Sequence, residues 1–135
     1  MALFTWNDSY SVKVAQCDRQ HQKLFEIINE LAESMRVGKG KEALAKTVGQ
    51  LLDYTRTHFQ QEEELMKKSG YADLAPHQAM HRKFEADIEG LIKQAQEGHA
   101  ANSIQVLNML RDWLMNHIQK VDKQYSAHLN AAGIH

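Results

Sequence analysis

Apolar residues recur every three or four positions along most of this chain, the spacing that one face of a helix produces. The pattern predicts four helices, over about 18–37, 41–68, 74–98 and 102–129. Chain breakers are scarce, since the 135 residues include one proline and seven glycines, and glycines stand at or near the predicted helix ends. Short connections between four helices of similar length favour an antiparallel up-down-up-down four-helix bundle, so we expect an all-α fold.

The first 17 residues lack this periodicity and are expected to form an extended N-terminal arm. We expect one domain over residues 1–135, with the arm at 1–17 and the bundle at 18–130, because no repeat, low-complexity tract or linker interrupts the chain. The arm carries three candidates for packing against the bundle, Phe4, Trp6 and Tyr10.

Charge and hydropathy argue against several classes of protein. Sixteen basic against 17 acidic residues give a formal net charge of −1, without the basic excess typical of nucleic-acid binding, so we expect no nucleic-acid partner. No apolar run approaches the roughly 20 residues that cross a bilayer, and the N-terminus lacks the pattern of a secretory signal. The lone Cys17 cannot form an internal disulfide, which suits a reducing compartment. We therefore expect a cytoplasmic monomer that is not membrane-embedded.

Histidines and carboxylates stand at metal-ligand spacing on every predicted helix. The candidate ligands are His21, His58, Glu62, His77, His81, His117 and Asp122. The first six lie on the apolar stripes of their helices, and an i,i+4 pair such as His58 and Glu62 shares one helix face. His117 and Asp122 are i,i+5, which is about 140° out of register in a regular helix. We therefore predict that the helix ends, kinks or carries a π-type bulge between them.

A bound metal would explain why so many polar side chains point inward. Burying five imidazoles and two carboxylates without partners costs several kcal/mol per charged group. With both oxygens of each carboxylate in use, the set offers nine donor atoms, more than one six-coordinate metal can take. Two metals that share a bridging oxygen would use them and keep one position open. Mixed imidazole and carboxylate ligation suits iron, with zinc, copper or manganese also compatible, and the lack of clustered cysteines argues against thiolate zinc and iron–sulfur sites.

Four segments that contain these ligands follow one another in a recognisable order, DRQH at 18–21, HFQQEE at 58–63, HQAMH at 77–81 and HIQKVD at 117–122. In them the chain resembles the hemerythrin family, in particular its single-domain bacterial members. Phe4-Thr5-Trp6 also resembles the N-terminal arm of that family, so the match covers nearly the whole chain. Cys17 stands where the family more often has an aliphatic residue, and we expect it to be a small packing residue.

The resemblance implies two iron ions joined by an oxo or hydroxo bridge. One iron would be held by His77, His81 and His117 and the other by His21 and His58, with Glu62 and Asp122 bridging the two. Molecular oxygen would bind end-on at the iron of His21 and His58, which keeps the open position. Leu114, one turn before His117, matches a position that packs over this oxygen pocket and would help to keep it dry.

The function that this resemblance implies is reversible oxygen binding for transport or storage, without catalytic turnover. Di-iron oxygenase bundles use paired Glu-x-x-His motifs, and this sequence has no such pair, which favours holding oxygen over activating it. An oxygen-consuming enzyme would be one recipient of the oxygen. Two alternatives stay open: a di-iron oxidase, peroxidase or nitric-oxide-handling enzyme, and a sensor module that responds to oxygen or iron.

Side chains next to the candidate ligands are expected to have supporting or neutral roles. Asp18 and Gln20 either orient His21 through hydrogen bonds or cap the first helix. Glu63 is expected to be a surface charge, with a hydrogen-bond acceptor behind one of the ligands as the alternative, and Trp113 to pack in the core or at its rim. Three further histidines lack partner spacing and are expected to be solvated: His99, His128 and His135.

Overall fold

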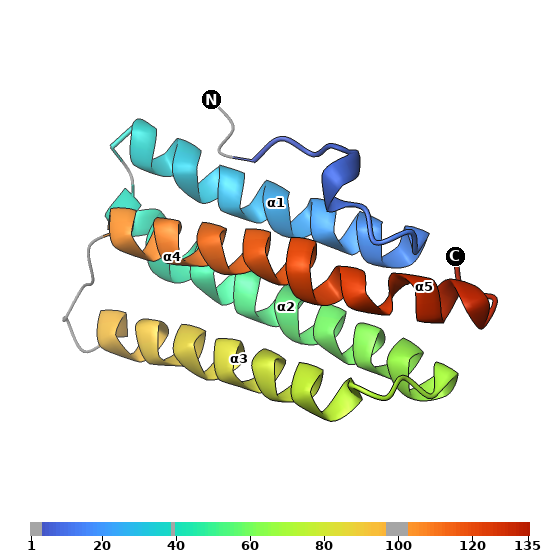
Figure 1. The fold of residues 1–135 in the computed structure, drawn as a ribbon. Coiled ribbons are helices and arrows are strands. Elements are labelled where there is room, and N and C mark those ends of the chain that lie inside the picture. The colour runs from blue at the N-terminus through green and yellow to red at the C-terminus, as the bar shows by residue number, and fades with distance from the viewer. Residues whose placement is uncertain (1–3, 39, 97–102) are drawn as a thin grey trace.

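Four helical rods make up the fold of the computed structural model, which describes residues 4–38, 40–96 and 103–135. The rods are α1 (Ala15–Arg36), α2 (Gly40–Ser69), α3 (Leu74–Gln96) and a last rod built from α4 (Ser103–Asn116), the π-helical turn η2 (His117–Asp122) and α5 (Lys123–Ala131). Successive rods run in opposite directions along one axis (Figure 1). The expected all-α, antiparallel up-down-up-down bundle is therefore confirmed.

One apolar stripe on each rod forms the core and fixes how the rod is rotated. Its most deeply buried members include Leu24, Ile28 and Leu31 on α1, Leu51, Phe59 and Met66 on α2, Phe84 and Ile88 on α3, and Leu110 and Leu114 on α4. Burying a side chain of this size is worth about 1.5–3 kcal/mol, so rotating a rod away from this orientation is costly. Polar residues that share the stripe are consequently held inside the bundle.

Met80 and Ile104 match the apolar spacing of the third and fourth predicted helices and were expected to face the core, but both lie outside it. Met80 is 43% exposed and Ile104 is 59% exposed. At about 100° per residue, Met80 lies to one side of the stripe that continues through Phe84 and Ile88. Ile104 points about 120° away from Leu110. Both corrections follow from the same point, that a few apolar residues flank a stripe without belonging to it.

The N-terminal arm packs along α1 as expected, and it includes the short 3₁₀ turn η1 (Asp8–Tyr10). The ring of Phe4 stacks on Phe25 with centroids 4.2 Å apart, and its backbone N–H donates to Oδ1 of Asn29 at 2.8 Å. Asp18 ties the end of the arm to the helix, since its carboxylate accepts from the backbone N–H of Val12 at 2.8 Å. This contact lets α1 begin at Ala15, earlier than the periodicity indicated.

Glycines and one proline mark the helix ends much as expected. Gly38 and Gly70 adopt φ values of 80° and 73°, which side chains rarely tolerate, and they follow the ends of α1 and α2. Pro76 lies in the first turn of α3, where its missing N–H costs little, and the carbonyl of Asp73 accepts from N–H of His77 at 3.2 Å. Gly98 lies outside the described residues. Within the described part of the chain, no helix combines the length and apolar character that spanning a membrane requires.

Candidate metal centre

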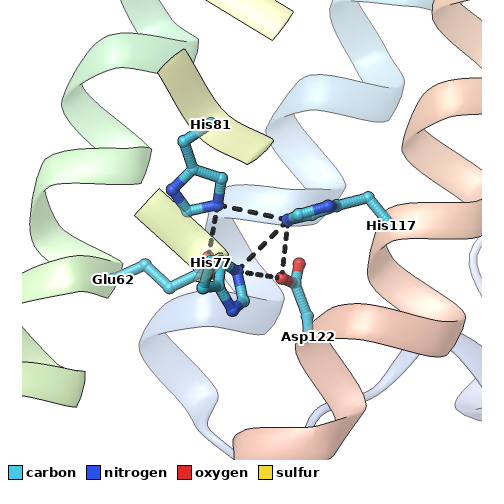
Figure 2. A group of neighbouring side chains, drawn as sticks. All are labelled: Glu62, His77, His81, His117 and Asp122. Atoms are coloured by element: carbon cyan, nitrogen blue, oxygen red, sulfur yellow. Dashed lines mark hydrogen bonds and ion pairs between the residues drawn. The ribbon is translucent and has the colours of Figure 1, made fainter. Parts of the chain in front are cut away.

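Seven buried polar side chains from all four rods meet inside the bundle. They are His21 from α1, His58 and Glu62 from α2, His77 and His81 from α3, and His117 and Asp122 from η2, each at most 5% exposed. Figure 2 shows the five of them that form the larger group, with their polar atoms turned toward one another. The second group consists of His21, His58, Glu62 and Asp122, and within each group the candidate ligand atoms lie within 4.8 Å of one another. All seven residues singled out from the sequence are thus brought together.

Glu62 faces histidines on both sides with separate oxygens. Its Oε1 atom lies 3.3 Å from Nε2 of His77 and 3.2 Å from Nε2 of His81. Its Oε2 atom lies 3.2 Å from Nε2 of His58 and 3.5 Å from Nε2 of His21. A carboxylate that offers one oxygen to each of two histidine groups could contribute a ligand atom to each of two metal ions.

Asp122 repeats this arrangement from the opposite rod. Its Oδ1 atom lies 3.0 Å from Nε2 of both His77 and His117, and its Oδ2 atom lies 3.3 Å from Nε2 of His21. The π-helical turn brings His117 and Asp122 to one side, because i→i+5 bonding places residue i+5 above residue i. The bulge predicted from their i,i+5 spacing is therefore confirmed.

The cluster fits metal ions, because several of its buried polar atoms lack a hydrogen-bond partner. Nε2 of His117 lies 3.1 Å from Nε2 of His81 and 3.2 Å from Nε2 of His77, so three ring nitrogens face one another. Among the described residues, both ring nitrogens of His21, Oε1 of Glu62 and Oδ1 of Asp122 are buried without a hydrogen-bond partner. Buried polar atoms are normally paired, and cations held here would satisfy Nε2 of His21, Oε1 of Glu62 and Oδ1 of Asp122 together.

The pKa values of the side chains in the cluster also indicate that it suits metal ions. Burial by itself would lower the pKa of His21 and of His77, but contact with Asp122 and Glu62 outweighs it and raises both pKa values to about 9. Burial would raise the pKa of Asp122, yet the surrounding imidazoles hold it well below its usual range. Protons on His21 and His77 are therefore able to compensate the two carboxylates. Metal ions would take over this role and displace those protons.

Glu63 supports the cluster from outside, which corrects the expectation that it is a surface charge. It is 8% exposed, and its Oε2 atom accepts from Nδ1 of His81 at 2.8 Å. Arg82 donates to the same oxygen at 2.5 Å. Because an ionised carboxylate only accepts, this contact fixes the tautomer of His81 with the Nε2 lone pair toward the cluster. The i,i+4 spacing drew attention to Glu62, and nothing in the sequence signalled that its neighbour points inward as well.

Gln20 has a similar role for a different histidine than expected. Its Oε1 atom accepts from Nδ1 of His58 at 2.6 Å, so it orients His58 rather than His21. The amide group of Gln20 also donates to Oε1 of Gln61, which accepts from Gln16 at 2.9 Å. The reason is that Gln20 faces α2, where His58 lies, and not His21, its neighbour in the chain.

Tyr125 is a site residue that the sequence reasoning missed. It is fully buried, and its hydroxyl group donates to Oε2 of Glu62 at 2.8 Å. Burial raises its pKa well above the usual value, so the phenol stays a neutral donor. The available signal was its position three residues after Asp122, which puts both on one helix face.

Aromatic rings pack against the histidines on one side of the cluster. Phe59 stacks on His81 with centroids 3.6 Å apart, and Trp113 stacks on His117 at 4.3 Å. Trp113 is thus a packing residue, as expected, and it lies directly on a candidate ligand. Leu114 is 2% exposed on the same rod, and its role over an oxygen pocket stays a prediction.

The remaining cysteine and histidines lie outside the cluster. Cys17 is 1% exposed, as expected of a packing residue. His128 is not simply solvated, because its Nε2 atom donates to the carbonyl of Ser69 at 2.8 Å and ties α5 to the end of α2. His135 is exposed, and His99 lies outside the described residues.

Known proteins resemble this chain over nearly its whole length. The family model for the "Hemerythrin HHE cation binding domain" matches residues 12–129. The chain belongs to the hemerythrin family. A bacteriohemerythrin of Methylococcus capsulatus is 39% identical over 132 residues, which cover 97% of this chain and 100% of that protein. Myohemerythrin of Theromyzon tessulatum is 29% identical over 126 residues, 93% of each chain.

A solved structure also supports membership of the hemerythrin family. The crystal structure of a wild-type hemerythrin superimposes with a TM-score of 0.87 at 37% identity, covering 95% of this chain and 98% of that one. The resemblance seen in the sequence is therefore confirmed. The expected di-iron cofactor and oxygen binding are the properties of hemerythrins, and the cluster is able to hold the metal ions.

Proposed function

We propose that this hemerythrin-family chain binds molecular oxygen reversibly at a di-iron centre and acts as an oxygen carrier or store rather than as an enzyme. The observation that supports it most strongly is the double contact of both carboxylates. Glu62 and Asp122 each place one oxygen near each of the two histidine groups. Three histidines stand on one side and two on the other, so the second side has one protein ligand fewer.

The ligand assignment is part of this proposal. One iron is assigned to His77, His81 and His117, the other to His21 and His58, and the bridging carboxylates are Glu62 and Asp122. When bound, the iron pair supplies the two electrons that reversible oxygen binding takes up and returns. The oxygen pocket is assigned to the two-histidine side, where Leu114 would exclude water.

The surroundings of the cluster suit carriage better than turnover. The side chains assigned as metal ligands are buried, and the rings of Phe59 and Trp113 cover two of the histidines. A dry site excludes the water and protons that side reactions of the bound molecule require. The neutral phenol of Tyr125 donates to Glu62 and holds one bridging carboxylate in place. These features support a carrier, and the enzyme and sensor alternatives are outcomes of the experiment below.

We further propose that the protein is a cytoplasmic monomer that passes its oxygen to an oxygen-consuming enzyme. The lone buried cysteine agrees with a reducing compartment. Among the described residues, the exposed large hydrophobic side chains are Val37, Met80 and Ile104. They offer little apolar area compared with the roughly 800 Å² per partner that a stable interface buries.

The deciding experiment is a visible absorption spectrum of the reduced, anaerobic protein with its iron content assayed. Spectra are recorded before oxygen is added, after it is added and after it is removed again. We expect about two irons per chain, as two metal groups imply, and an absorption band that appears with oxygen and disappears without it. Irreversible oxidation on first contact would favour the enzyme or sensor alternatives. A protein that takes up no iron would contradict the proposal as a whole.

A further inference from the structure

The two histidine groups differ in the acceptors that stand behind them. His81 donates through Nδ1 to the carboxylate of Glu63 at 2.8 Å. His58 donates through Nδ1 to the neutral amide oxygen of Gln20 at 2.6 Å. In both rings the other nitrogen, Nε2, faces the cluster. The acceptor behind each ring therefore acts on the electron pair that the ring presents to a metal.

The charge behind His81 is only partly neutralised. Arg82 donates to Glu63, but it also contacts Glu85 at 3.1 Å, and its side chain is 54% exposed. The side chain of Glu63 is 10% exposed, so its negative charge acts largely inside the protein, where screening is weak. Behind His58, by contrast, Gln20 continues into the amides of Gln61 and Gln16, and that chain is neutral throughout.

A carboxylate behind a ligating histidine has a known physical effect. Hydrogen bonds with an ionised partner are roughly twice as strong as neutral ones, and a carboxylate acceptor raises the basicity of the ring. Removing such partners typically lowers metal affinity about 10–100-fold. The histidine with a carboxylate behind it is consequently a better donor than the histidine with an amide behind it.

We propose that Glu63 is a positioning residue that makes the two metal positions unequal, so that the position of His77, His81 and His117 binds its metal more tightly and fills first. The inference rests on the ligand assignment of the proposed function. Three histidines against two favour the same order, so the test has to separate the charge of Glu63 from ligand number.

Glu63→Gln makes this separation, because glutamine keeps an acceptor oxygen and loses the charge. Metal-free protein is titrated with cobalt(II) under anaerobic conditions, and two stepwise dissociation constants are obtained by absorption and chelator competition. We expect the tighter constant to weaken about 10–100-fold and the weaker one to change by less than about threefold. Glu64→Gln is the matched control, since Glu64 is the exposed next residue and loses the same charge.

Gln20→Glu tests the opposite change. A carboxylate behind His58 is expected to tighten the weaker constant by about tenfold, a gain that mere structural damage would not produce. The amide of Gln61 can rotate to donate to the new carboxylate. Gln60→Glu, at an exposed position of α2, adds the same charge without facing a histidine and serves as the control.

The outcomes separate this inference from the proposed function. Wild-type protein that binds two cobalt ions while Glu63→Gln leaves both constants unchanged, or weakens both equally, would contradict the inference alone. Wild-type protein that binds fewer than two cobalt ions would contradict the ligand assignment and the inference with it. Histidine ¹⁵N NMR of metal-free Glu63→Gln checks that His81 keeps its Nδ1–H tautomer, and loss of that tautomer with equal weakening of both sites would also count against a charge effect.

Discussion

Glu62 and Asp122 lie between the two histidine groups, and the ion-pair partners that the described residues give them are imidazoles. Both are at most 1% exposed, and their pKa values are lowered although burial acts in the opposite direction. Two ionised carboxylates at one buried point repel each other strongly. Their joint presence is physically reasonable when positive charge, from protons or from metal ions, stands between them.

His77 is the histidine that contacts both carboxylates on the three-histidine side, at 3.3 and 3.0 Å. His77→Ala is expected to reduce metal content from about two ions per chain to about one, because one position loses a ligand while the other keeps its set. Metal analysis after gel filtration measures this, with circular dichroism to confirm that the bundle is folded. His135→Ala, at the exposed chain end, is the control. Full loading of the His77 variant would show that the ligand assignment is wrong.

Leu114 lies one turn before His117 and is 2% exposed. Leu114→Tyr is expected to lower oxygen affinity about tenfold or more, because forcing extra atoms into a packed site costs about 1–3 kcal/mol. Leu114→Met, which nearly conserves volume, is the matched control. Oxygen equilibrium curves of the three proteins at equal iron content measure the effect. Equal affinity in the tyrosine variant would mean that Leu114 does not line the pocket.

At this scale the sequence predicted the candidate ligands but not their supports. Six of the seven candidates were found because helical spacing places them on buried stripes, a local property of each rod, and Asp122 was proposed together with an irregular turn after His117. Glu63, Gln20 and Tyr125 act across helices, on His81, His58 and Glu62. Such contacts depend on the rotation and separation of two rods, which no single stretch of sequence encodes.

At the scale of elements, the π-helical turn η2 is the feature on which the geometry of the last rod depends. It inserts one residue into an otherwise helical rod, so that α4 and α5 both present their apolar residues to the core while His117 and Asp122 face the same point. The i,i+5 spacing predicted this irregularity. Helix starts were less predictable, because α1 begins at Ala15 through a contact between Asp18 and the arm.

Deleting Lys120, which is exposed inside the π-helical turn, should convert the rod to a regular helix. His117 and the former Asp122 would then be i,i+4 and still share one face, so we expect about two cobalt ions per chain and affinities within about tenfold of wild type. Cobalt titration measures the number of bound ions and their affinities. Thermal melts check that the bundle stays folded.

The control for this deletion removes Lys123, an exposed residue of α5 in a regular helix. That deletion rotates Tyr125 and Leu129 by about 100° relative to Asp122, so we expect a lower Tm and weaker metal binding. If deleting Lys120 abolishes metal binding as completely as deleting Lys123, the bulge contributes more than the alignment of two ligands.

At the scale of the whole molecule, the metal-free bundle is expected to have an unusual pH dependence of stability. His21 and His77 have pKa values raised to about 9 in the folded protein, above the ordinary value of 6.5. The folded state therefore binds more protons than the unfolded state between these values. The stability that they contribute is complete below about pH 6.5 and is lost as the pH rises through about 9.

Other groups in the cluster set the acid side of this profile. Glu62 and Asp122 have lowered pKa values, so their contribution is present above their usual pKa and is lost as the pH falls. Burial chiefly lowers the pKa of His58, which is neutral in both states above pH 6.5 and adds no slope there. The metal-free protein should therefore be most stable in a mildly acidic window and less stable at about pH 9.

Loading the protein with metal should remove the alkaline loss, because a coordinated Nε2 atom carries no proton that a rise in pH could take away. Metal also binds the folded state alone and raises its stability at every pH where the ligands can be deprotonated. Urea unfolding of metal-free and cobalt-loaded protein at about pH 6 and about pH 9 gives the comparison. We expect the urea midpoint of the metal-free protein to be lower at about pH 9 than at about pH 6. The midpoint of the cobalt-loaded protein should be equal or higher at about pH 9. A metal-free protein that gains stability toward pH 9 would mean that protonated histidines do not compensate Glu62 and Asp122, and the electrostatic account of the empty cluster would have to be abandoned.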